Sequence, residues 1–434
     1  MDQISQSTET AGPLLPPVHD PLGQLSDLPR ELSPWLGGKA PRPIFDCLSR
    51  ARDHGGWHWP EQPVIFVSDA HADAEGFLRS LVAAGVIRRD DGAITLTRFG
   101  QSARIIVGGD SLDKGPSNLD LLDALAALRA SGAQFDLLAG NHDLRMRMAV
   151  DAVHGPRSAL REHLFVRMGR KILPALREVL DRFVTGDDLA ALPDEAACAA
   201  RLMPSKGWSK RFAKAARGQL SDKAIKKEIT KLDEKLRKFD RERAKVGMSH
   251  RELLAAVLKC HDIFFVPGGA YAWFYEEMEV VARCGSLLFV HAGLCDEMCR
   301  LLVRGGAAEV NARYRTEAET ASLGFYFGPL ANLVRTKYRA SDCTLTQAGV
   351  DLLHRDGIHM IVQGHVNNHS GQHLRAKRGL LHLEGDITLD RASRRLEGLE
   401  GIGAGATLIF PSGDVIGLSR DHPTAKHFAP GRLV

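Results

Sequence analysis

The 434-residue sequence lacks the marks of several protein classes. Its seven cysteines are an odd number without a CxxC pair, which argues against a disulfide framework and for a reducing compartment. No run approaches the ~18 to 20 apolar residues of a membrane span, and the first residues have neither a basic start nor an apolar core. A net charge of only +4 gives no argument for nucleic acid. We therefore expect a cytoplasmic protein.

What the sequence does contain is a set of polar turns, each directly after an apolar, β-prone run. The runs are residues 64–67, 105–107, 135–139, 287–290 and 360–363, and the turns that follow them begin at Asp69, Gly109, Gly140, His291 and Gly364. Because open α/β sheets build their sites at the carboxyl ends of strands, we expect these turns to meet at one edge. They offer carboxylate, imidazole and amide groups and no thiolate, which suits a pair of divalent cations.

These turns resemble the signature of the calcineurin-like metallophosphoesterase superfamily. That signature runs Asp-x-His, Gly-Asp-x-x-Asp-Arg-Gly, Gly-Asn-His-Asp/Glu and then two later histidines. Within it, residues 64–142 are most similar to the bacterial-type, Shewanella-like phosphoprotein phosphatases, and the similarity extends to residues 328–335 and 364–386. Residues 1–60 and most of 144–282 are outside it. The resemblance implies an α/β fold, a four-layer α/β/β/α sandwich with a helical insertion as a cap.

The resemblance also implies a role for each residue of the turns. Two divalent metal ions would be bound, with Mn favoured and Fe, Zn or Co as alternatives, and a hydroxide between them would attack phosphorus. His142 would be the general acid that protonates the leaving oxygen, with Asp113 orienting its ring. The metal ligands would be Asp69 and His71 on the first ion, Asp110 bridging both, and Asn141, His291 and His365 on the second.

Departures from the family pattern concern phosphate binding. Lys114 stands where the family has Arg, and a lysine cannot grip two phosphate oxygens in a planar fork. Arg145 and Arg335 are therefore candidates to bind substrate together with Lys114, although Arg145 also fits a solvated charge in a first helical turn. His369 could add a metal ligand, but its spacing favours an ordinary loop histidine. Asp386 fits a structural group better than a catalyst.

The rest of the chain predicts its organisation. We expect a partly disordered N-terminal extension (1–60), the first half of the core (61–150), a basic helical insertion (151–282) and the second half of the core (283–434). Apolar residues recur every three or four positions over 160–179 and 224–243, which predicts amphipathic helices. Between residues 201 and 250 there are 16 Lys or Arg against 6 Asp or Glu. This surplus of positive charge fits either a solvated helical face or a patch that steers acidic substrates. If it is a substrate patch, neutralising Lys223, Lys226 and Lys227 should raise KM for acidic substrates.

The function predicted from these features is that of a metal-dependent phosphatase acting on phosphomonoesters, with phosphorylated protein side chains as substrate. A dinucleoside polyphosphate or nucleotide pyrophosphohydrolase is the first alternative, because it would use the same metals and nucleophile. A non-catalytic scaffold that binds a partner through the cap is the second. The expected partner is a phosphorylated protein or a small phosphorylated metabolite, and neither a membrane nor nucleic acid is expected.

Overall fold

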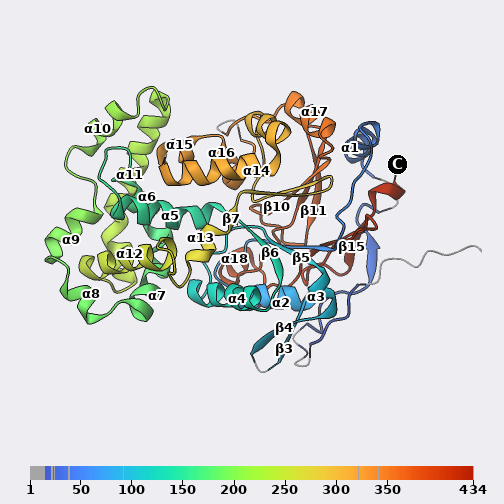
Figure 1. The fold of residues 1–434 in the computed structure, drawn as a ribbon, viewed down its shortest axis with the longest axis horizontal. Helices are drawn as coiled ribbons and strands as arrows, with labels where there is room; N and C mark the ends of the chain where they lie inside the picture. Colours follow the sequence, from blue (N-terminus) through green and yellow to red (C-terminus); the bar gives the residue numbers. More distant parts are fainter. Residues whose placement is uncertain are drawn as a thin grey trace, which may run out of the picture.

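The computed structural model describes residues 15–20, 23, 25–37, 40–90, 92–320, 322–339 and 342–433, and two sheets form its centre (Figure 1). The first sheet has the strand order β1-β15-β14-β13-β2-β5-β6-β7 and the second β11-β12-β10-β9-β8. The strands of the first sheet are β1 (Leu32–Pro34), β2 (Val64–Val67), β5 (Arg104–Val107), β6 (Gln134–Leu138), β7 (Met278–Glu279), β13 (Thr407–Ile409), β14 (Val415–Gly417) and β15 (Ala425–Phe428). Those of the second are β8 (Val281–Cys284), β9 (Leu287–Val290), β10 (Met360–Gln363), β11 (His373–Lys377) and β12 (Leu380–Glu384).

Side chains alternate along the strands and so bury both faces of each sheet. Val64 and Phe66 of β2 face the second sheet, where the Phe66 ring lies 5.9 Å from that of Phe289. Ile65 and Val67, one position along, instead pack with the helices outside the first sheet. The same alternation holds in β9 and β10. Two sheets face to face with helices outside are the predicted four-layer α/β/β/α sandwich, and this prediction is confirmed.

The outer layers consist of helices that follow the strands. They are α1 (Arg42–Asp53), α2 (Ala74–Ala83), α3 (Arg98–Ser102), α4 (Asn118–Ala130), α5 (Asn141–His154), α14 (Asp296–Thr320), α15 (Ser322–Phe327), α16 (Leu330–Arg335), α17 (Gln347–Arg355) and α18 (Arg391–Glu397), with a 3-10 turn at Pro430–Arg432 and a hairpin of β3 (Ile87–Asp90) and β4 (Ala93–Leu96). Side chains cap α2 and α4 at their first turns, through Asp73 and Ser117. No helix in the described part of the chain has the length and apolar character needed to cross a lipid bilayer.

The central strands run parallel, which aligns their carboxyl ends. In the first sheet β2 pairs with β5 and β5 with β6, and in the second β9 pairs with β10 and β10 with β12, all in parallel. All five apolar runs named from the sequence are strands, so these predictions are confirmed. The first sheet is completed by late segments of the chain, since β2 also pairs antiparallel with β13, and β1 pairs parallel with β15. Early and late parts of the sequence are therefore interleaved in one sheet.

Between α5 and β7 the chain forms a helical cap. Its elements are α6 (Leu164–Met168), a 3-10 turn η1 (Gly169–Lys171), α7 (Leu173–Phe183), α8 (Gly186–Ala190), α9 (Glu195–Leu202), α10 (Trp208–Ala215), α11 (Asp222–Lys245), α12 (His250–Phe265) and α13 (Ala272–Glu276). Figure 1 shows it as a lobe at one end of the sandwich. The helix predicted over 224–243 is confirmed as α11. The helix predicted over 160–179 is broken by η1, because Pro174 at the start of α7 has no N–H to continue the ladder.

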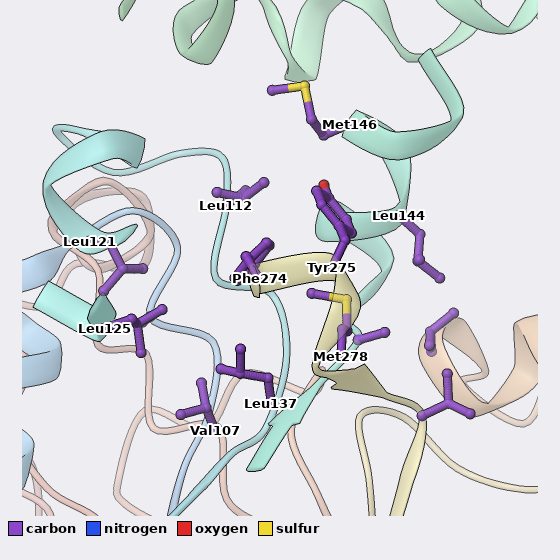
Figure 2. Close-up of a cluster of buried hydrophobic side chains, with 14 of the residues drawn as sticks. Val107, Leu112, Leu121, Leu125, Leu137, Leu144, Met146, Phe274, Tyr275 and Met278 are labelled. Atoms are coloured by element: carbon purple, nitrogen blue, oxygen red, sulfur yellow. The ribbon is translucent and has the colours of Figure 1, made fainter. Parts of the chain in front are cut away.

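The last helix of the cap is packed into the core beside the strand ends. Figure 2 shows Phe274 and Tyr275 of α13 among Val107, Leu137 and other buried side chains from β5, β6, α4 and α5. The Tyr275 hydroxyl donates a hydrogen bond of 2.8 Å to the carbonyl oxygen of Asp143 in α5. The cap is thereby fixed to the helix that starts with Asn141 and His142.

Part of the N-terminal extension packs against the core. Residues 1–14 of the extension, which was expected to be partly disordered, lie outside the described residues. Leu25 and Leu28 are buried in the main apolar cluster. Further on, the rings of Trp57 and Trp59 stack at 5.2 Å and lead directly into β2.

Candidate metal centre and active site

The turns after β2, β5 and β10 hold their polar residues in unusual backbone conformations. Asp69, His71, Asp110, Asp113 and His365 all have positive φ, between 45° and 74°. Non-glycine residues adopt such angles rarely, and they are concentrated at functional sites. Since these five come from three separate turns, the local strain coincides with the place where the turns meet.

Two glycines let the turns approach one another. A side chain at Gly140 would collide with the backbone and carboxylate of Asp110, and one at Gly364 would collide with Ser68 and Asp69. The close approach brings together groups from both sheets. The amide nitrogen of His365 donates to Asp69 Oδ2 over 2.9 Å, and that of His142 donates to Asp110 Oδ1 over 2.7 Å.

The Asp110 carboxylate is shared by two groups of potential metal ligands. One group is His71, Asp110 and His142, and the other is Asp110, His291 and His365; within each group the ligand atoms lie within 4.8 Å of one another. Asp110 Oδ2 is 3.4 Å from His291 Nε2 and 3.9 Å from His71 Nε2. The first group is completed by Asp69, whose Oδ1 lies 3.7 Å from His71 Nε2. This arrangement suits one carboxylate between two cations.

The ring nitrogens of His291 and His365 fit metal ions better than they fit protein partners. His291 Nδ1 lies 2.8 Å from the carbonyl oxygen of Gly108, which only a protonated Nδ1 can satisfy. Its Nε2 faces Asp110 Oδ2 and, like Nε2 of His365, is buried without a hydrogen-bond partner among the described residues. Burial would lower the pKa of His291, but Asp110 and Asp69 raise it to about 10, so a cation bound here would replace a proton on this nitrogen. An imidazole held by a backbone carbonyl on one nitrogen and free on the other is the usual form of a metal-binding histidine. Asn141 lies between His365 Nδ1 and His142 Nε2, at 3.1 and 3.2 Å.

The electrostatics of the cluster also favour bound cations. Burial alone would raise the pKa of the Asp110 carboxyl, but His291 and His142 outweigh it and hold that pKa well below its usual range. Burial raises the pKa of Asp69 to about 6, with the charge of Asp110 adding to the effect. Asp386, buried behind them, has its pKa raised well above the ordinary value by burial and by Asp69. Buried carboxylates that repel one another in this way are stabilised by a divalent ion.

His142 and Asp113 form a close pair at the same edge. His142 Nδ1 lies 2.6 Å from Asp113 Oδ2, and the opposite ring nitrogen is 3.8 Å from Asp110 Oδ2. Burial would raise the pKa of Asp113, but its bonds to His142 and Lys171 lower it to about 2. Burial lowers the pKa of His142, against the opposing effect of Asp110 and Asp113. Asp113 therefore stays ionised and fixes the imidazole's orientation.

Three other residues shape this edge and were not predicted from the sequence. Lys171 of η1 places Nζ 3.1 Å from Asp113 Oδ2, so the cap contributes a cation directly to the His142–Asp113 pair. Asp143 accepts from the amide nitrogens of Leu112 and Gly140 and so joins two of the turns. Ser68 donates to Asp69 Oδ2 over 2.5 Å. No pattern in the sequence marks Lys171, because its contact depends on the path of the cap.

The three residues expected to bind substrate, Lys114, Arg145 and Arg335, lie at different places around the site. Lys114 Nζ lies 2.7 Å from His71 Nε2, a ligand nitrogen of the first group. Arg145 lies close enough to His142 for its positive charge to add to the lowering of that ring's pKa, of which burial is the largest cause. Arg335 places its guanidinium 4.6 Å from the centre of the Tyr326 ring, on the side of α16 that faces the cap. His369 pairs with Glu397 at 3.0 Å in an exposed loop.

Comparison with known proteins gives structural matches alone. No protein-family model and no curated protein matches the chain. A cold-active protein tyrosine phosphatase matches with 14% identity over 84% of this chain and 78% of that one, at a TM-score of 0.45. A cold-active protein-tyrosine phosphatase of a psychrophilic Shewanella species matches with 16% identity over 84% and 80%, at 0.42. A protein serine/threonine phosphatase from Saccharomyces cerevisiae matches with 9% identity over 86% and 82%, at 0.37. What this chain does is therefore inferred from its own residues.

Proposed function

We propose that this protein is a dinuclear metal-dependent phosphatase that hydrolyses phosphomonoesters, with phosphorylated protein side chains as its substrates. The observation that carries the proposal is the position of Asp110 between two groups of potential ligands, with the Nε2 atoms of His291 and His365 beside it, which have no hydrogen-bond partner in the described part of the chain. A scaffold protein has no use for buried imidazole nitrogens without partners, since each costs free energy in a metal-free fold.

The ligand set fits two divalent ions, which when bound would supply an activated water and neutralise charge on the phosphoryl oxygens. Asp69 and His71 would hold the first ion, Asp110 both, and Asn141, His291 and His365 the second. The carboxylates and imidazoles suit Mn, and Fe, Zn and Co accept the same donors.

His142 would move the proton that the leaving oxygen needs. Its Nδ1 is held by Asp113 at 2.6 Å, which leaves Nε2 as the nitrogen directed towards the ligand groups. General acid catalysis of this kind is most useful for a poor leaving group such as an alkyl oxygen. Lys114, Arg145 and Lys171 place cationic charge around the same edge and would attract the phosphate dianion. We also include Arg335 among the substrate-binding residues, because it lines a cavity between the cap and α16.

The experiment that tests the proposal is phosphate release by the Mn-loaded protein. A phosphoserine peptide, a phosphotyrosine peptide and diadenosine tetraphosphate are compared, with Asp110→Asn as the inactive control and Asp46→Asn, an exposed residue of α1, as the matched one. We expect turnover of a peptide that disappears only in Asp110→Asn. Faster cleavage of the dinucleotide would instead make the protein a pyrophosphohydrolase, and no release from any substrate by protein that retains two metal ions would favour the scaffold.

A further inference from the structure

A cavity of about 490 Å³ lies between the cap and the α15–α16 segment. In Figure 1 the start of the cap and α11 lie beside α15 and α16, although these elements are far apart in the sequence. Basic and amide side chains line the cavity together with two carboxylates; these residues include Arg167, Lys223, Lys227, Lys231, Asn332, Arg335, Glu228 and Asp342. None of the predicted metal ligands lines it, so the cavity is a separate space.

The cavity has a large surplus of positive charge. Of its two carboxylates, Glu228 is paired with Arg167 at 2.8 Å, and Asp342 accepts hydrogen bonds from the backbone nitrogens of Lys337 and Arg339. Among the described residues, no carboxylate lies within ion-pairing distance of the side chains of the other lining cations, which are Lys223, Lys227, Lys231, Arg335 and Arg339. Burial lowers the pKa of Lys231, and the charges of Arg167 and Lys227 lower it further. An anion in the cavity would relieve this repulsion.

The walls also offer a fixed guanidinium. Arg335 is held over the Tyr326 ring at 4.6 Å and is therefore restricted in orientation. Lys227 and Lys231 of α11 line the opposite wall. Cations from two helices, without carboxylate partners among the residues that the structure describes, indicate an anionic ligand.

The cavity lies one helix away from the metal centre. Asn332 and Arg335 of α16 line it, while the same helix contacts the metal-binding turns through its backbone. The carbonyl oxygen of Leu333 accepts a hydrogen bond from the backbone nitrogen of Ala292, next to His291. The carbonyl oxygen of Val334 lies 3.3 Å from the side-chain nitrogen of Asn141. A helix with its side chains is about 10–12 Å across, and an extended peptide covers about 3.3 Å per residue. An extended substrate that passes around α16 would therefore need at least about three or four residues between the two places.

We propose that this cavity is an anion subsite that binds an acidic or phosphorylated side chain about three or four residues from the scissile phosphoester. The inference rests on the proposed phosphatase function and deepens it, since it makes the preferred substrate an acidic phosphopeptide. Lys227 and Lys231 of α11, with Arg335 of α16, would contact the second anionic group. Lys226, which the sequence grouped with Lys223 and Lys227, does not line the cavity and serves as the matched control.

The test is a set of phosphoserine peptides with one aspartate placed at each position up to six residues on either side, against a parent with asparagine. We expect kcat/KM to rise about tenfold when the aspartate is three or four positions away. In Lys227→Gln/Lys231→Gln this preference should disappear, while Lys226→Gln should keep it. Each value is divided by the same variant's turnover of p-nitrophenyl phosphate, which removes general effects on the metal centre. Equal kcat/KM for all aspartate positions would overturn the subsite and leave the phosphatase function intact.

A binding measurement separates failure of the subsite from failure of the phosphatase function. A fluorescein-labelled acidic peptide without phosphate is titrated with each variant and followed by anisotropy. Weaker binding in Lys227→Gln/Lys231→Gln than in Lys226→Gln supports the subsite even for a protein that hydrolyses nothing, in which case only the phosphatase function is wrong. Identical binding by both variants contradicts the subsite.

Discussion

The strand-end turns and the cavity beside the cap differ in how their charged side chains are surrounded. In the turns, the carboxylates and imidazoles are mostly buried, two carboxylates accept hydrogen bonds from the backbones of neighbouring turns, and five of the residues have left-handed backbone conformations. In the cavity, lysines and arginines line an open space, and most have no carboxylate partner in the described chain. The turns can therefore position metal ions and a proton donor accurately, whereas the cavity can attract an anion without holding it rigidly. Under the proposed function, chemistry and substrate recognition would lie in different parts of the fold.

Two contacts connect these parts. Lys171 reaches from the cap to Asp113, and Tyr275 of the cap's last helix donates to the backbone of Asp143. The division between chemistry and recognition is therefore open to experiment, and four substitutions test it from the largest expected effect to the smallest.

Asp110→Asn should have the largest effect. The amide cannot replace a carboxylate that faces both ligand groups, so we expect loss of bound metal and a decrease in turnover on the order of 10³-fold or more. Metal content by mass spectrometry and phosphate release from a phosphoserine peptide measure the two effects. Retention of two equivalents of metal by Asp110→Asn would show that Asp110 is not the shared ligand.

His142→Asn should decrease turnover of a phosphoserine peptide by roughly 10² to 10⁴, the contribution of a general acid. Hydrolysis of p-nitrophenyl phosphate should decrease less, because its leaving oxygen needs little protonation. The metal content decides between two roles, since His142 also lies in a ligand group with His71 and Asp110. Loss of one ion from His142→Asn would make the imidazole a ligand.

Glu162→Gln should destabilise the cap without changing the chemistry. Burial would raise the pKa of Glu162, but hydrogen bonds from Ser205, Arg157 and Arg211 lower it to about 2. A carboxyl with a lowered folded-state pKa stabilises the fold above its ordinary pKa of about 4.5 and loses that effect as the pH falls towards 2.

We therefore expect Glu162→Gln to cost about 1 to 3 kcal/mol of unfolding free energy at pH 6, with the difference from wild type shrinking below pH 4.5. Thermal melts across this range measure it, with the exposed Glu234→Gln as control. A difference that stays constant down to pH 3 would mean that the charge of Glu162 is not what stabilises the cap.

Lys171→Ala should have the smallest effect. Its ammonium is about one-third exposed, and ion pairs of that kind contribute less than about 1 kcal/mol, so kcat/KM should decrease less than about fivefold. Lys206→Ala, an exposed lysine elsewhere in the cap, is the control. A decrease of 100-fold or more would show that the cap takes part in catalysis, and that chemistry and substrate recognition are not separated in this fold.

The sequence predicts the sandwich and the convergence of the turns well, for a physical reason. The apolar runs at 64–67 and 360–363 are buried on both faces, so their pattern identifies strands directly, and parallel strands necessarily bring their carboxyl ends together. Strands such as β13, with three residues, carry too little pattern to be found. They are specified by their partners in the sheet and not by their own sequence.

Side-chain directions outside the strand ends could not be predicted. Arg335 follows from the family pattern, but its guanidinium is directed by the aromatic ring of Tyr326. Lys171 reaches Asp113 only because η1 turns the chain between two helices. The direction of Arg335 depends on a ring nine residues earlier in the chain, and that of Lys171 depends on a local break in a helix. Periodicity carries no information on either.

The interleaving of early and late strands has a consequence for synthesis of the chain. While the ribosome is still producing the cap, β2 has an unpaired edge, because β13 is encoded near the other end of the sequence. Two of the imidazoles, His291 and His365, also arrive after the cap has been made. A truncated chain would therefore expose an unpaired strand edge and lack two of the six proposed ligands, which would make it a substrate for chaperones and proteases before a metal centre could form.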